Sequence, residues 1–309
     1  MQVDVKKVML VGLVVFFALS FGASPLLAAT GWSNLISVEQ LKSELSNPKL
    51  VILDARKGDD AVDRFSKGHI HGSQFVKYSD VAPHRGGFES EMPEPDNFEA
   101  VMRKAGVNND SLVVVVADAM NPNAFAFGPR LYWTLKNFGF ENVHLLNGGI
   151  TSWMNAGEEI AQGAPSAAEN EGNFTAVGSD NYPYHATKED VIKALEKNQD
   201  VIDARSMPVY LGLASRPGWL QLGHIDGAKF AYYGMLFESN GEYRSKEVLE
   251  QIFSDLKLNL DTPSISHCGD GYGCMTLWFA VSEILGKDHT MYDAGMFEWD
   301  IPTSTKLQN

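Results

Sequence analysis

Three short motifs occur twice along this chain, in the same order and displaced each time by about 150 residues. The repeated pairs are VILDAR at 51–56 and DVIDAR at 200–205, GHIHGS at 68–73 and GHIDGA at 223–228, and NGGITSW at 147–153 and DAGMFEW at 293–299. Motifs that recur in order at a fixed period indicate a duplicated architecture. We therefore predict two copies of one domain, each of about 130 residues.

Each copy alternates patterns typical of strands with patterns typical of helices. Short apolar runs that fit strands buried on both faces lie at residues 50–53, 112–117, 201–202 and 265–266. Apolar residues at helical spacing follow at 130–138 and 275–285, and Gly139 and Gly286 are expected to stop those helices. Capping signals at 37–40 and 187–190 indicate where two further helices begin. This alternation predicts an α/β fold with a largely parallel sheet flanked by helices in each copy.

The first residues of the chain have the pattern of a secretory signal peptide. Lys6 and Lys7 precede an apolar run at residues 8–20, and small residues follow as far as Ala29. An uncleaved membrane anchor is the alternative, but the apolar core is shorter than the roughly 20 residues that a span needs. We expect a signal peptide at 1–29 and an exported protein, in a bacterial periplasm, with no stable membrane span after cleavage.

The segment between the two copies has the composition of a linker. Residues 163–180 are rich in Gly, Ala, Ser and Pro and lack hydrophobic periodicity, which is typical of an exposed connection. We expect an N-terminal domain at 30–162 and a C-terminal domain at 181–309. The net charge of −14, from 25 basic and 39 acidic residues, repels phosphate backbones and argues against a nucleic-acid partner.

Both cysteines of the chain lie in one segment, residues 264–276, where a predicted strand ends and a glycine-rich turn precedes a helix. Open α/β sheets bind ligands at the carboxyl ends of their strands, which is where Cys268 lies. The turn consists of Gly269, Asp270, Gly271, Tyr272 and Gly273. Backbone N–H groups that converge in such a turn bind an anion and lower the pKa of a thiol. We predict that Cys268 is a nucleophile and that the turn binds substrate, in preference to a buried structural cysteine.

Four features follow one another along the chain: the Asp-x-Arg strand, the Gly-His-Ile-x-Gly turn, the cysteine loop and residues 292–299. Together and in this order, they resemble a tandem rhodanese-type sulfurtransferase of the thiosulfate and 3-mercaptopyruvate sulfurtransferase family. The resemblance covers the chain after the expected signal peptide. It implies two tandem rhodanese-like domains, of which only the second carries the catalytic cysteine. In the first copy Asp118 follows the equivalent strand, and we expect that half to help shape the cleft, because a carboxylate cannot form a persulfide.

The resemblance implies a double displacement through a persulfide on Cys268. The thiolate attacks the outer sulfur of a small anionic donor, such as thiosulfate or 3-mercaptopyruvate. Cyanide, a small thiol or a protein thiol then accepts the sulfane sulfur. No metal or organic cofactor is implied, because the cysteine sulfur carries the transferred atom.

The chain departs from the family pattern around this loop. Asp270 adds a negative charge: directed inward, it would raise the pKa of Cys268 and repel a dianionic donor, but we expect it to face solvent, where it is nearly neutral. Gly273 replaces a hydroxyl residue, which removes a possible proton relay. Residues 209–212 lack the arginine usual in the family, whereas Arg216 matches a second basic position, which binds the carboxylate in mercaptopyruvate enzymes. Arg216 is therefore a candidate substrate ligand, with a solvated loop charge as the alternative.

Several polar residues recur in the copy without a cysteine, and we assign them to the fold: Asp54, Arg56, His69, Asp203, Arg205 and His224. We expect their hydrogen bonds and ion pairs to fix the geometry between strand and turn. His267 precedes Cys268 on a strand and points to the opposite face, so we expect it to be packed. Arg130, on the helix after Asp118, is expected to form a local ion pair with it.

The second cysteine, Cys274, has two interpretations. We favour a small side chain that fills the first turn of a helix. The alternative is a disulfide with Cys268, which would make the site of an exported protein a redox switch.

Two other classes of function are compatible with parts of the loop. A catalytically silent rhodanese-like module, acting as a sulfur carrier, sensor or protein-binding domain, would explain the missing arginine and Asp270. A cysteine phosphatase or arsenate reductase also has a His-Cys pair before a tight loop. Those enzymes need an arginine that clamps the oxyanion, and the loop here ends instead at Cys274.

Overall fold

Two five-stranded sheets follow one another along the chain, and both have the same strand order. The computed structural model describes residues 32–84, 87, 90–118, 121–177, 182–214 and 222–299. The first sheet has the order β1-β5-β4-β2-β3 and the second β6-β10-β9-β7-β8, so corresponding strands take corresponding places. Neighbouring strands in both sheets pair in parallel. The predicted α/β fold with a duplicated, parallel-sheet domain is confirmed.

Among its described residues, the N-terminal half has five strands and seven short to medium helices. Its strands are β1 (Leu35–Ile36), β2 (Leu50–Arg56), β3 (Gln74–Lys77), β4 (Leu112–Ala117) and β5 (Val143–Leu146). Its helices in the described ranges are α1 (Val38–Ser43), α2 (Ala61–Lys67), α3 (Tyr78–Val81), α4 (Pro95–Lys104), α5 (Pro122–Phe125), α6 (Phe127–Asn137) and α7 (Gly149–Asn155).

The C-terminal half repeats this succession with shorter strands. Its strands are β6 (His185–Ala186), β7 (Val201–Asp203), β8 (Lys229–Phe230), β9 (Ser264–His267) and β10 (His289–Tyr292). Its described helices are α8 (Lys188–Glu196), α9 (Met207–Tyr210), the 3₁₀ turn η1 (Tyr233–Leu236), α10 (Lys246–Asp255), α11 (Cys274–Trp278), the π-helix η2 (Phe279–Ile284) and α12 (Gly295–Trp299).

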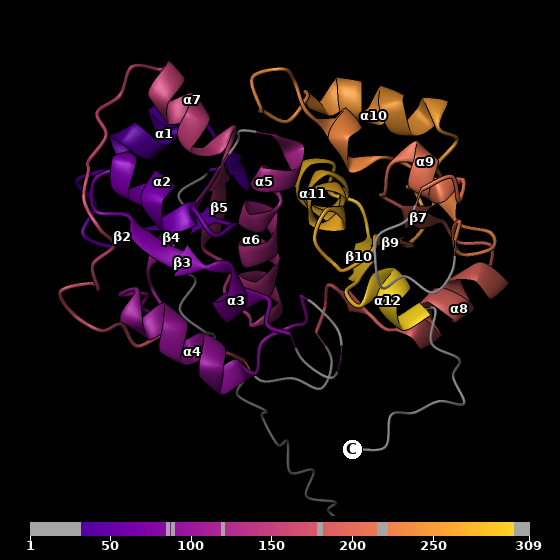
Figure 1. The fold of residues 1–309 in the computed structure, drawn as a ribbon, viewed down its shortest axis with the longest axis horizontal. Coiled ribbons are helices and arrows are strands. Elements are labelled where there is room, and N and C mark those ends of the chain that lie inside the picture. The colour runs from indigo at the N-terminus through magenta and orange to yellow at the C-terminus, as the bar shows by residue number, and fades with distance from the viewer. Residues whose placement is uncertain are drawn as a thin grey trace, which may run out of the picture. The chain divides into compact units, whose positions relative to one another are not determined.

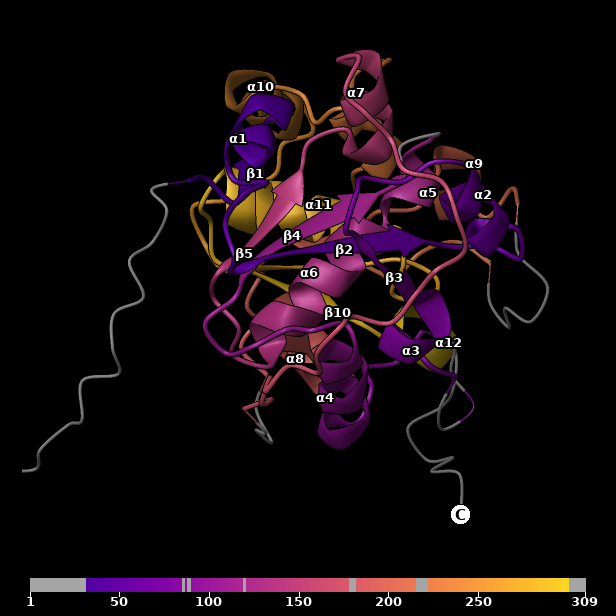
Figure 2. The same cartoon turned by 90° about the vertical axis from the view of Figure 1, so that its left-hand side faces the viewer.

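Alternate residues of the central strands pack against helices on opposite faces of the sheet. On β4, Val113 and Val115 belong to one buried cluster, and Val114 and Val116 belong to another. Helices α3, α4 and α6 cover the first face, while α1 and α7 cover the second (Figure 2). This two-residue period explains why β4 is apolar along its whole length.

The two halves share one hydrophobic core, which lies where α6 packs against α11 (Figure 1). The rings of Tyr132 on α6 and Phe279 on η2 meet edge to face with their centroids 4.9 Å apart. The Tyr132 hydroxyl donates a hydrogen bond to Glu283 at 2.8 Å, and Trp133 Nε1 donates to the carbonyl of Tyr184 at 3.1 Å. The halves therefore hold each other in place through buried contacts.

Local signals in the sequence are confirmed at both ends of several helices. Ser37 and Thr187 form the predicted capping boxes, and Gly139 and Gly286 follow their helices with φ of +80° and +66°. The predicted helix at 275–285 differs in winding, because it begins as α11 and continues as the π-helix η2. The i→i+5 hydrogen bond from Leu285 N to Ala280 O, at 3.0 Å, belongs to this wider turn.

The connection between the halves is only partly exposed. Most described residues of 163–177 are accessible, but Phe174 is buried against Phe98 and Phe140. Its backbone N–H donates to Val107 O at 3.0 Å, which fixes this part of the connection to the N-terminal half. The expected signal peptide at 1–29 lies outside the described residues. In the described part of the chain, no helix has both the length and the apolar character that crossing a bilayer requires.

Candidate active site

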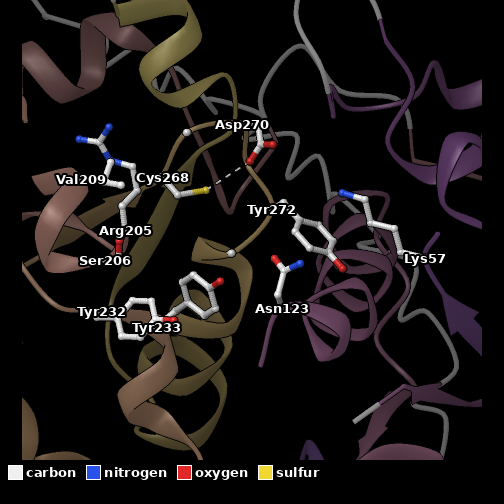
Figure 3. Close-up of a pocket in the computed structure, with 12 residues that line it drawn as sticks. Lys57, Asn123, Arg205, Ser206, Val209, Tyr232, Tyr233, Cys268, Asp270 and Tyr272 are labelled. Carbon is white, nitrogen blue, oxygen red and sulfur yellow. Dashed lines mark hydrogen bonds between the residues drawn. The ribbon is translucent and has the colours of Figure 1, made fainter. Parts of the chain in front are cut away.

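The cysteine loop lines a pocket of about 360 Å³ at the junction of the two halves (Figure 3). Cys268 directly follows β9, at the carboxyl end of the parallel sheet, as expected for a ligand site in this fold. The C-terminal half contributes Arg205, Ser206, Val209, Tyr232, Tyr233, Cys268, Gly269, Asp270, Tyr272 and Gly273 to the lining. The N-terminal half contributes Lys57 and Asn123. Of the predicted loop residues, only Gly271 is not part of this lining.

Hydrogen-bond donors surround the Cys268 sulfur. The Cys274 thiol donates to Cys268 Sγ at 3.0 Å, and the backbone N–H groups of Cys274 and Asp270 also point to it. Burial is the largest single influence and raises the pKa of Cys268. The hydrogen bonds outweigh burial, so the pKa of this thiol lies below its ordinary value. The arrangement therefore favours the thiolate, which is the nucleophilic form.

The side chain of Asp270 does not face solvent, which corrects the expectation from the sequence. Only 6% of Asp270 is exposed, and its Oδ1 lies 4.0 Å from Cys268 Sγ (Figure 3). Because a nearby carboxylate disfavours a second negative charge, Asp270 raises the pKa of Cys268 and opposes the hydrogen bonds. The loop thus combines donors that stabilise the thiolate with one acidic group that destabilises it.

Glycines allow the loop to approach the segment after β10. Gly271 has a φ of +67°, and a Cβ atom there would lie 2.3 Å from the backbone oxygen of Asp293. Gly295, in the third repeated motif, has a φ of +55°, and its Cβ would lie 2.6 Å from the carbonyl oxygen of Cys268. Its counterpart Gly149 approaches Ala117 O in the same way, so the residue equivalent to Cys268 is Ala117 and not Asp118, which lies one position further along the loop. The third motif is therefore repeated because the chain must pass close to the end of the central strand.

Arg130 holds the cysteine loop from the other half of the molecule, so the expected pair with Asp118 is wrong. Its guanidinium forms a buried, bidentate ion pair with Asp293, in which Nη2 donates to Oδ2 at 3.1 Å. Nη1 also donates to the carbonyl of Gly271 at 3.2 Å. Asp118 instead accepts a hydrogen bond from Arg64 Nε at 2.7 Å. The side of α6 that carries Arg130 packs against the second half, so Arg130 pairs with Asp293 and not with Asp118.

Lys57 brings a positive charge from the N-terminal half to the pocket. It follows β2, and its Nζ lies 3.7 Å from the ring centroid of Tyr272 and 4.1 Å from that of Tyr78. Aromatic faces stabilise an ammonium group at such distances. Tyr272 therefore acts as part of the wall that positions Lys57, and its own side chain is 3% exposed.

Tyr233 occupies the space beside Gly273. A Cβ at position 273 would lie 2.7 Å from Cε1 of the Tyr233 ring, so a larger residue would collide with it. Burial raises the pKa of Tyr233, and the negative charge of Cys268 raises it further, so the phenol keeps its proton. The pocket therefore contains a hydroxyl donor near the cysteine, although Gly273 itself provides none.

The repeated Asp and Arg residues form the expected ion pairs. Arg205 Nη2 donates to Asp203 Oδ2 at 2.6 Å and to the carbonyl of Gly223 at 2.7 Å. The same two contacts recur in the first copy between Arg56, Asp54 and Gly68. These bonds join the strand to the second motif in both halves, which confirms a fold role. Arg205 also lines the pocket, which the repeat alone does not predict.

The histidines also have structural positions. His69 stacks on Phe65 and His224 on Tyr210, with centroids 3.9 and 3.8 Å apart, and each Nδ1 meets the carbonyl of its stacking partner at 2.9 Å. His267 is fully buried, as predicted, and burial lowers its pKa. None of the three lines the pocket among the described residues.

Two further expectations have different outcomes. Cys274 is the first residue of α11 and is fully buried, and both cysteines are free thiols. Arg216 lies outside the described residues. Within the described ranges, no group of three or more His, Cys, Asp or Glu side chains is arranged to hold a metal ion.

Several residues that line the pocket are not predicted from the sequence as site residues: Lys57, Asn123, Ser206, Tyr232 and Tyr233. A signal for two of them exists in the repeat, because Lys57 and Ser206 each follow the last residue of the Asp-Ala-Arg motif. The corresponding ends of β2 and β7 thus meet at one pocket.

Comparison with known proteins agrees with this geometry. The rhodanese-like domain family matches residues 37–156 and 187–301. The 3-mercaptopyruvate sulfurtransferase of Escherichia coli K12 is 28% identical over 280 residues, covering 88% of this chain and 95% of the relative. A putative thiosulfate sulfurtransferase of Haloferax volcanii is 32% identical over 213 residues, covering 66% and 71%. The crystal structure of SseA from Escherichia coli, a 3-mercaptopyruvate sulfurtransferase, superposes with a TM-score of 0.74 at 26% identity, covering 85% of this chain and 99% of SseA.

Proposed function

We propose, since the chain belongs to the rhodanese-like domain family in both of its halves, that it is a sulfurtransferase and that Cys268 carries the sulfur as a persulfide. The observation that carries this proposal is the Cys268 sulfur at the pocket wall, where thiol and amide donors lower its pKa. The sulfurtransferase relatives that align along most of the chain support the reaction class.

The proposed reaction begins with attack of the Cys268 thiolate on the outer sulfur of the donor. The bond between that sulfur and the rest of the donor breaks, and its electron pair leaves with the departing fragment. A thiol, cyanide or protein-thiol acceptor then attacks the outer sulfur of the persulfide and restores Cys268. The protonated hydroxyl of Tyr233 is positioned to donate a hydrogen bond within the pocket.

The charges of the pocket favour a donor with one negative charge over a dianion. Lys57 attracts an anion, whereas the charge of Arg205 is largely compensated by its ion pair with Asp203, and the buried carboxylate of Asp270 lies beside the nucleophile. We therefore assign a 3-mercaptopyruvate-like carboxylate as the preferred donor and thiosulfate as the poorer one. We also propose Arg216 as a second ligand of the donor's carboxylate.

The test of the function is a covalent adduct. Purified protein is incubated with 3-mercaptopyruvate, or separately with thiosulfate, and analysed by intact mass and peptide mapping. We expect an increase by the mass of one sulfur atom on the peptide that contains Cys268. The absence of both adduct and turnover with either donor would contradict the proposal.

The charge of Asp270 gives a prediction about pH. In Asp270→Asn the carboxylate that raises the pKa of Cys268 is removed, while the backbone N–H of residue 270 remains. The pH midpoint for alkylation of Cys268 by iodoacetamide should therefore move to lower pH, and turnover with thiosulfate should rise relative to 3-mercaptopyruvate. Asp110→Asn, before β4 and on the protein surface, is the control and should leave the midpoint unchanged. A midpoint displaced upward would show that Asp270 does not act through its charge.

Lys57 gives a prediction about donor binding. Lys57→Met keeps an unbranched side chain over Tyr78 and Tyr272 but removes the charge. Loss of one partly exposed charge contact costs about 1 kcal/mol, so KM for 3-mercaptopyruvate should rise roughly fivefold with little change in kcat. Lys49→Met, at the other end of β2, is the matched control. Equal KM values for wild type and Lys57→Met would exclude Lys57 from donor recognition.

We also propose that the protein is exported to the periplasm and that its domains are residues 30–162 and 181–309, joined by 163–180. The basic and apolar pattern of residues 1–29 supports export, and the anchored Phe174 supports a short, fixed connection.

A further inference from the structure

A second thiol lies against the nucleophile and is not needed to hold the donor. Cys274 Sγ is 3.0 Å from Cys268 Sγ, and Cys274 is fully buried in the first turn of α11. Cys268 lines the pocket, whereas Cys274 does not belong to its described lining. The Cys268 sulfur therefore has the pocket on one side and a thiol from the protein interior on another.

We propose that Cys274 is a resolving thiol, which attacks Sγ of the Cys268 persulfide, forms a Cys268–Cys274 disulfide and releases hydrosulfide into the pocket. This inference rests on the proposed function, because it requires the persulfide. It adds an activity to that function: the chain can discharge its sulfur as sulfide without an external acceptor.

The atoms and electrons of this step balance within the protein. The bond from Cys274 Sγ to Cys268 Sγ forms, and the bond from Cys268 Sγ to the outer sulfur breaks. The anionic outer sulfur of the persulfide first takes the proton of the Cys274 thiol, which makes Cys274 the attacking thiolate. The outer sulfur then leaves with the electron pair of its broken bond, so persulfide anion plus thiol becomes disulfide plus hydrosulfide. The two cysteine sulfurs are oxidised and the sulfane sulfur is reduced. A dithiol, small or protein-borne, then reduces the disulfide before the next turnover.

The arrangement of the two sulfurs fits this displacement. Thiol–disulfide exchange proceeds by attack on a sulfur atom with departure of the group bound to it. The donor reaches Cys268 through the pocket, so the outer sulfur is delivered on the pocket side, while Cys274 contacts Cys268 from within the protein. The two sulfurs need to approach by about 1 Å to reach the bond length of a disulfide.

The segment between the two cysteines is rich in glycine, whose backbone has the widest range of allowed conformations. Three of its five residues are glycine, namely Gly269, Gly271 and Gly273. Burial raises the pKa of Cys274, so this thiol keeps its proton in the resting protein. Cys268 therefore reacts with the donor first, and Cys274 still carries a proton that it can give to the outer sulfur.

The experiment is a single turnover without added thiol. Fully reduced protein is mixed with one equivalent of 3-mercaptopyruvate, and sulfide and intact mass are followed with time. In the wild type we expect a transient persulfide, then a species lighter than the reduced protein by two hydrogen atoms, with release of one sulfide per chain. Peptide mapping should join Cys268 to Cys274, and a sample without donor controls for oxidation by air.

Cys274→Ser separates resolution from hydrogen bonding. The serine hydroxyl can still donate to Cys268 but cannot form a disulfide, so the variant should acquire the persulfide and retain it. Sulfide release in the single turnover should fall at least tenfold relative to the wild type. Cys274→Ala, which also lacks the donor, should load sulfur more slowly and retain it as well.

The outcomes distinguish this inference from the function on which it rests. A wild-type persulfide that persists without disulfide or sulfide would overturn the role of Cys274 and leave the sulfurtransferase intact. No persulfide in the wild type or in Cys274→Ser would reject the sulfurtransferase itself. If neither variant folds, disulfide mapping and sulfide release in the wild type still decide the question.

Discussion

Cys268→Ser is expected to lower sulfur transfer by at least about a thousandfold, because Cys274, the other cysteine of the chain, is fully buried outside the described pocket lining and is not accessible to the donor. A serine hydroxyl has nearly the shape of the thiol but does not ionise at neutral pH and forms no persulfide. The measurement is kcat/KM with 3-mercaptopyruvate and cyanide, together with intact mass after incubation with the donor. The substitution should remove both turnover and adduct.

The stability of the Cys268→Ser protein is the necessary control. The hydrogen bonds to residue 268 come from backbone groups and from Cys274, and a hydroxyl can accept them, so the thermal midpoint should stay close to that of the wild type. Turnover that survives in a folded Cys268→Ser protein would place the chemistry elsewhere. A folded wild type with neither turnover nor adduct would favour the silent rhodanese-like module.

Arg130→Met is expected to cause the largest loss of stability. It leaves the carboxylate of Asp293 buried without its cationic partner, and breaking a buried ion pair in this way costs about 3–5 kcal/mol. For a chain of this size the thermal midpoint should fall on the order of 10 °C. Because Arg130 also holds the carbonyl of Gly271, sulfur transfer by the remaining folded protein should decrease as well.

A double variant tests whether the unpaired charge is the cause. Arg130→Met combined with Asp293→Leu removes both charges, and apolar pairs of similar volume often match a buried ion pair in stability. The double variant should therefore be more stable than Arg130→Met alone. Lys287→Met, which breaks the surface pair with Asp261, should cost less than about 1 kcal/mol. A midpoint for Arg130→Met equal to that of Lys287→Met would show that the pair is not needed for stability.

The fold was predictable because its signals are local and occur twice. The apolar run at 112–117 is β4 over its whole length, and the capping signals at Ser37 and Thr187 begin α1 and α8 as expected. These patterns depend on burial of strands and on bonds within one turn, which the sequence contains directly. The sequence does not predict the π-helix after Trp278, because the spacing of apolar residues does not distinguish i→i+5 from i→i+4 hydrogen bonding.

The site was predictable only as far as the cysteine loop itself. Cys268, at the end of a strand before glycines, requires no knowledge of the other half. The pair of Arg130 with Asp293 joins residues 163 positions apart, and nothing near Asp118 in the sequence excludes the local pair. Lys57 likewise lines the pocket only because one half packs against the other, which the local sequence does not show. The inward orientation of Asp270 likewise depends on surroundings that the sequence does not describe.

The contact between α6 and α11 joins equivalent helices of the two copies, and equivalent positions, Lys57 and Ser206, border one pocket. Such a contact between like surfaces is how identical subunits associate about a two-fold axis. The tandem chain is thus a covalent counterpart of a symmetric dimer, with each half in a fixed one-to-one ratio to the other. Fusion frees one of two equivalent loops from the chemistry, and this freedom allows an alanine at 117 where the other half has cysteine.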